Sequence, residues 1–170
     1  MRLKGGIAMA LVAVALVAVP PAQAASTRAE YVAQVDPICQ ASAGPLSSGF
    51  ATYQAAFRRA VRSARKGNIK AFIRAARATA NSLIGLSQIH ANLANQIQPV
   101  QPVATDAAAV SSWLNALRQE GGFEAAAASA LQHAKIRVFF SNLNQADTAL
   151  AAGKSAIAGF GFHVCGVTVA

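Results

Sequence analysis

Apolar residues recur every three or four positions along most of the chain, the spacing that places side chains on one face of an α-helix. The clearest stripe begins at Phe72 and ends at Ile97, with an unbroken alternation of four and three. No stretch alternates like a strand over a useful length. The pattern predicts an all-α protein, a four- to five-helix up-down bundle. Its five predicted helices cover residues 28–43, 46–66, 69–98, 105 or 106 to 120, and 123–152.

Glycine and proline set the predicted helix ends. Gly67 ends the second helix, and prolines within residues 98–103 predict an extended crossover, because proline has no backbone N–H. Residues 43–48 are predicted to form a turn, the segment 120–122 to break the next helix, and Gly153 to stop the last one. Pro37 within the first helix either kinks that helix or lies in the first turn of a second helix that begins there, capped by Asp36.

The first 24 residues have the pattern of a secretory signal peptide. Arg2 and Lys4 precede an apolar run over residues 7–19, and the small-x-small pattern at 22–24 places cleavage after Ala24. The apolar run is shorter than a membrane-spanning helix requires, and no second one approaches that length. We expect one secreted domain over residues 25–170, extracellular or associated with the cell envelope, with no membrane span after cleavage.

The chain has two cysteines, Cys39 and Cys165, 126 residues apart. In an oxidising compartment outside the membrane they are most economically interpreted as one disulfide, and two free thiols are the alternative. Chain entropy assigns such a long loop roughly 4 to 5 kcal/mol of stabilisation as an upper figure. The tail would fold back as a clasp over the first helix, helped by the glycines at 159, 161 and 166.

Both ends of this proposed clasp carry a recognisable sequence. Residues 31–39, "YVAQVDPIC", and 159–166, "GFGFHVCG", resemble the end signatures of small secreted alanine-rich helical proteins of actinobacteria. Those proteins combine a first-helix Tyr-x7-Cys with a C-terminal Gly-Phe-x-x-Cys-Gly, carried here by Tyr31, Cys39, Gly161, Phe162, Cys165 and Gly166. The resemblance implies a disulfide-clasped helical bundle outside the membrane. It implies no catalytic or binding residue.

Charge is distributed unevenly along the chain. There are 15 Lys and Arg against 6 Asp and Glu, and no acidic residue lies between Asp36 and Asp106. Eight cations flank Gly67 and are here called the basic corner: Arg58, Arg59, Arg62, Arg65, Lys66, Lys70, Arg74 and Arg77. The corner is either a solvated face that maintains solubility or a surface attracted to anionic lipid headgroups or cell-wall polymer. Export argues against nucleic acid as the partner.

Few residues could carry chemistry. His90, His133 and His163 come from separate segments without helix-spaced ligands beside them, so we expect no metal site and no cofactor. The acidic residues from Asp106 onward are interpreted as helix-end or exposed groups, among them Glu120 and Glu124. No catalytic residue is assigned.

The sequence therefore favours a secreted non-enzymatic module that contacts anionic envelope components through the basic corner. A first alternative is a carrier of small apolar ligands with a pocket between Trp113, Phe160 and Phe162. A second alternative is an enzyme that uses His90 or His133. The sequence leaves the oligomeric state open.

Overall fold

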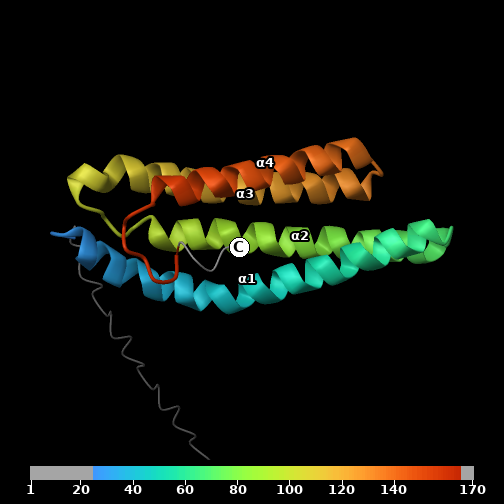
Figure 1. Ribbon diagram of the computed structural model, residues 1–170, viewed down its shortest axis with the longest axis horizontal. Helices are drawn as coiled ribbons and strands as arrows, with labels where there is room; N and C mark the ends of the chain where they lie inside the picture. The colour runs from blue at the N-terminus through green and yellow to red at the C-terminus, as the bar shows by residue number, and fades with distance from the viewer. Residues whose placement is uncertain (1–24, 166–170) are drawn as a thin grey trace, which may run out of the picture.

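Four long helices run up and down in sequence order in the computed structural model, which describes residues 25–165 (Figure 1). Each helix packs along the next one in the chain. This arrangement, with its tail tied to the first helix, confirms the predicted fold class. The elements are α1 (Arg28–Arg65), α2 (Ile69–Ile97), the short 3-10 turn η1 (Ala104–Asp106), α3 (Ala107–Gln132) and α4 (Ile136–Ala156).

The predicted turn at residues 43–48 is wrong, because α1 continues through both Pro37 and Pro45. A proline inside a helix costs about 3 kcal/mol, since it removes one hydrogen bond and crowds the preceding turn. Here buried residues on either side of the prolines, Val35, Cys39 and Leu46, hold both halves against the rest of the bundle. The prolines bend α1 rather than break it (Figure 1).

The predicted break at residues 120–122 and the stop at Gly153 are also wrong. A Cβ added to Gly121 would lie 2.9 Å from the carbonyl oxygen of Ser87, and one on Gly153 would lie 3.1 Å from the Cβ of Ala116. These two glycines therefore permit close contact between helices, α2 with α3 and α3 with α4. The chain turns instead between α3 and α4 at Ala134, whose φ of 54° is unusual for a residue with a side chain.

Two apolar clusters fill the bundle. One surrounds the N-terminal half of α1 and includes Tyr31, Trp113 and Cys165. The other lies toward the α1–α2 and α3–α4 turns and includes Leu46, Leu83 and Phe139. We call these two ends the clasp end and the open end. The predicted α2 stripe lies between α1 and α3 and links both clusters.

Candidate functional sites

The clasp end is joined covalently. Cys39 and Cys165 form a disulfide with their Cα atoms 5.2 Å apart, which confirms the predicted pairing. The carboxylate of Asp36 accepts hydrogen bonds from the backbone N–H groups of His163 (2.9 Å), Val164 (3.2 Å) and Cys165 (3.3 Å). Gly159 and Gly161 have positive φ, as a chain turning back requires, whereas Gly166 and the signal peptide lie outside the described residues.

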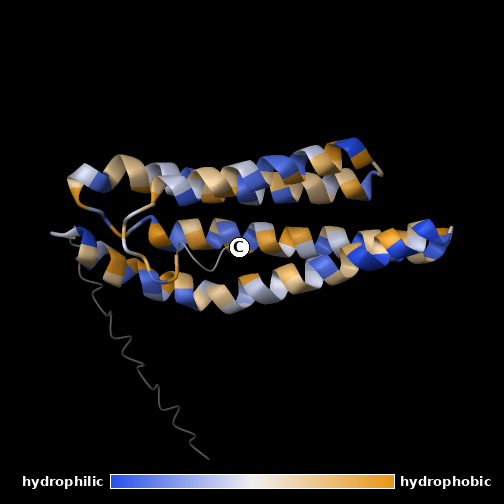
Figure 2. Cartoon of the chain, in the orientation of Figure 1, coloured by the Kyte–Doolittle hydropathy of each residue, from blue (hydrophilic) through white to orange (hydrophobic). Residues whose placement is uncertain are grey.

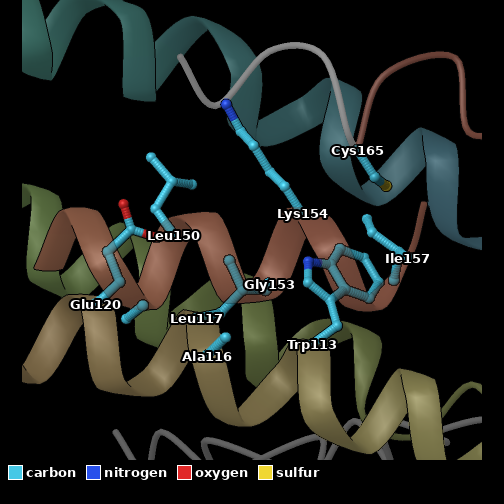
Figure 3. Close-up of a pocket in the computed structure, with 10 residues that line it drawn as sticks. Trp113, Ala116, Leu117, Glu120, Leu150, Gly153, Lys154, Ile157 and Cys165 are labelled. Atoms are coloured by element: carbon cyan, nitrogen blue, oxygen red, sulfur yellow. The ribbon is translucent and has the colours of Figure 1, made fainter.

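The three aromatic residues predicted to line a pocket do come together at this end. The Phe162 ring lies 5.3 Å from Trp113 and stacks on Phe160 at 5.8 Å between centroids. Figure 3 shows the hollow beside Trp113, bordered by Leu117 and Cys165. Its volume is about 10 Å³, room for roughly one water molecule. A hollow of this size is too small for an organic ligand.

Arg28 ties α1 to the start of α3. Its guanidinium makes two hydrogen bonds to the carboxylate of Asp106, at 2.7 and 2.5 Å, and lies 4.7 Å above the Phe160 ring. The hydrogen bonds from Arg28 lower the pKa of Asp106. Asp106 immediately precedes α3, at its N-cap, but its side chain makes no capping hydrogen bond there.

The open end carries the basic corner on the last turns of α1 and the first turns of α2. All eight of its side chains are exposed, and Lys135 and Arg137 add two exposed cations beside the α3–α4 turn. Figure 2 shows polar residues concentrated at this tip of the α1–α2 hairpin. The structure thus brings the predicted residues together on one end of the bundle.

Exposed apolar side chains lie among these cations, a feature that the sequence analysis missed. Ile69 is 72% exposed and Phe140 is 48% exposed, values far above those of the core. The same end also exposes Ile73, Ile136 and Val138. Between the two hairpins runs an apolar groove of about 220 Å³, lined by carbon atoms of Phe57, Phe72, Leu131, Phe139 and Phe140.

A buried polar cluster lies in the middle of the bundle. The Nδ1 atom of His90 on α2 is 2.9 Å from Oε2 of Glu124 on α3, and its Nε2 atom is 3.7 Å from Oε1 of Glu120. The His90 side chain is fully buried, and the two glutamates are 4% and 5% exposed. The predicted exposed or helix-end positions of these glutamates are therefore wrong.

Burial and charge act on this cluster in opposite directions. Burial raises the pKa of Glu120 to about 7, only partly offset by His90. For His90, burial lowers the pKa, but the hydrogen bond that its ring donates to Glu124 and the charges of both glutamates outweigh it, so the net shift is upward. Both shifts are upward, so both groups keep a proton more readily than the same groups in water.

The three histidines do not meet. His133 follows the last residue of α3 and His163 lies in the clasp, whereas His90 lies within α2. Within residues 25–165, His90, Glu120 and Glu124 form the one cluster of three potential metal-binding side chains. Pairing two glutamates with a histidine from a different helix depends on the α2–α3 register, which no local motif encodes.

Comparison with known protein families, with characterised proteins and with solved structures found no match. The resemblance to secreted actinobacterial proteins stays a prediction. Across the described part of the chain, no helix is both long and apolar enough to cross a bilayer.

Proposed function

We propose that this protein is a secreted, non-enzymatic module that attaches to anionic phospholipid membranes through its open end. One observation carries the proposal: large apolar side chains, Ile69 and Phe140 foremost, are exposed among the cations of the basic corner. Cations alone would bind any polyanion. Apolar side chains beside the cations can also insert into a lipid surface, which has hydrocarbon beneath its charged headgroups.

The magnitudes favour such an interface. A basic residue near an anionic membrane contributes about 1 kcal/mol, and the corner supplies eight. Inserting a side chain such as Phe140 adds about 0.8 kcal/mol for each CH₂ group that leaves water. An anionic wall polymer offers the charge attraction but no hydrocarbon into which Phe140 could insert. A membrane offers both, so it is the better partner. The signal-peptide pattern and the disulfide support a location outside the cytoplasm.

Vesicle sedimentation tests the proposal. The oxidised protein should bind phosphatidylcholine vesicles only when they contain phosphatidylglycerol, and more weakly at roughly 0.5 M than at 0.1 M salt. The double variant Arg62→Gln/Arg74→Gln should lose about 2 kcal/mol, or roughly 30-fold in affinity. The control Arg118→Gln/Lys154→Gln changes net charge equally outside the basic corner and should bind within about threefold of wild type.

Two results would contradict membrane attachment. Equal losses in both double variants would mean that only net charge matters. Binding to a soluble anionic polymer with the same affinity, insensitive to Phe140→Ser, would identify the partner as a polymer rather than a membrane.

A carrier of small apolar ligands remains the second candidate, favoured by the groove at the open end rather than by Trp113. The groove of about 220 Å³ is lined by Phe57, Phe139 and Phe140 and could accept an acyl chain. A fluorescent apolar probe displaced by a fatty acid, with displacement lost in Phe57→Ser, would support this function.

A further inference from the structure

The His90 cluster leaves two polar atoms without partners. Among the buried side-chain atoms of residues 25–165, His90 Nε2 and Glu120 Oε2 make no hydrogen bond. Glu124 satisfies the other ring nitrogen, Nδ1, at 2.9 Å. Buried polar atoms in proteins are nearly always paired, so two unpartnered atoms on neighbouring side chains call for a physical explanation.

The separation of these groups suits a shared cation. His90 Nε2 and Glu120 Oε1 are 3.7 Å apart, which is too far for a hydrogen bond. Bonds of about 2.1 Å to one tetrahedral ion would hold two such ligand atoms roughly 3.4 Å apart. One donor atom from each of His90, Glu120 and Glu124 lies within 4.8 Å of the others.

We propose that His90 Nε2 and the Glu120 carboxylate bind a divalent first-row transition metal, represented by Zn²⁺. Glu124 accepts a hydrogen bond from Nδ1–H, which fixes the ring orientation and makes Nε2 the metal-binding atom. This pairing of a ligating histidine with a carboxylate is common around protein metals. An imidazole ligand favours Zn²⁺ and its neighbours over Ca²⁺ and Mg²⁺.

The carboxylates of the cluster lie at the edge of a groove, and close helix packing keeps the histidine in place. Glu120 and Glu124 form part of a groove of about 370 Å³, whose other walls include Tyr53 from α1 and Asp147 from α4. Water from that groove can complete the coordination shell. On the opposite side, Gly121 lets α3 approach the backbone of α2 beside His90, with an added Cβ only 3.4 Å from the His90 Cβ.

Metal titration of the oxidised, chelator-treated protein tests the site. Zn²⁺ should bind with one ion per chain by calorimetry, and Co²⁺ should produce a visible absorption band that Zn²⁺ abolishes. Glu120→Gln keeps the size of the side chain and should weaken binding by at least tenfold. Glu124→Gln should weaken it by about 10-fold to 100-fold, as losses of such orienting partners do.

The matched control is His133→Gln, which removes an exposed histidine and should change affinity by less than twofold. Circular dichroism melts of each metal-free variant check folding, and X-ray absorption of the Zn²⁺ complex should show one imidazole among nitrogen and oxygen ligands. Absence of saturable binding, unchanged binding in folded Glu120→Gln, or loss of binding in His133→Gln would each overturn the proposal. Vesicle binding does not involve this cluster, so the two proposals can fail separately.

Discussion

The two ends of the bundle are built in different ways. At the clasp end, the disulfide, three hydrogen bonds to Asp36 and the Arg28–Asp106 pair join segments far apart in sequence. The hollow beside Trp113 there has a volume of about 10 Å³. At the open end, the helices meet around an apolar groove of about 220 Å³, and Ile69 and Phe140 face solvent.

This difference separates stability from recognition. Regions held by many buried contacts and cross-links open rarely, whereas regions with exposed apolar groups open more easily and are suited to binding. Charge follows the same division, because Glu30, Asp36 and Asp106 lie toward the clasp end and the basic corner lies at the open end. On an anionic membrane the open end would face the lipid and the clasp end would point away from the membrane.

The largest expected effect comes from removing the disulfide. Cys39→Ser/Cys165→Ser should lower the free energy of unfolding by up to about 4 to 5 kcal/mol, because a long loop is no longer closed in the unfolded chain. Urea denaturation measures the loss, and reduced wild-type protein should behave like the variant. Hydrogen exchange should accelerate around residues 157–165 and the start of α1 more than at the α1–α2 turn. A loss below about 1 kcal/mol would contradict the assigned role of the clasp.

A neighbouring pair of phenylalanines tests the open end. Phe139 is 1% exposed and Phe140 is 48% exposed. Phe139→Ala should cost about 3 to 4 kcal/mol in urea denaturation, because it leaves a cavity in the core. Phe140→Ala should cost less than about 1 kcal/mol yet weaken vesicle binding several-fold. Equal losses of stability would show that Phe140 belongs to the core rather than to a binding surface.

The sequence predicts those parts of the fold that depend on helical periodicity or that allow only one arrangement. The stripe from Phe72 to Ile97 predicted a helix over residues 69–98, and α2 spans Ile69–Ile97. Two cysteines allow one intramolecular pairing, so the clasp could be predicted without knowledge of packing.

Predictions failed where tertiary packing outweighs local preference. Pro45 and Gly121 are strong local signals for a break, yet both lie inside helices whose neighbouring residues are buried. The real turn at Ala134 contains neither glycine nor proline. The basic corner could be predicted because charge density is visible in sequence. Exposure of Phe140 and the meeting of His90 with Glu120 could not, because both depend on which helix faces pair.

The smallest effect expected here concerns one polar atom in the clasp end. The hydroxyl of Tyr31 is buried without a hydrogen-bond partner, while its ring packs edge-on against Phe162 at 6.3 Å. Tyr31→Phe keeps the ring and removes the unsatisfied hydroxyl, so it should raise the free energy of unfolding at pH 7 by up to about 1 kcal/mol. A loss of stability would mean that the hydroxyl has a partner, such as a bridging water.

Alkaline pH should enlarge this difference between Tyr31→Phe and wild type. Burial raises the pKa of Tyr31 to about 12, against an ordinary value of 10.0. The folded state therefore keeps the proton while the unfolded chain releases it, so the contribution of Tyr31 is complete below pH 10 and is lost as pH rises toward 12. Wild type should lose about 1 kcal/mol more than the variant between pH 9 and 11, measured by urea denaturation. Tyr53 is present in both proteins, so its own titration cancels, and parallel pH profiles would mean that water reaches the Tyr31 hydroxyl.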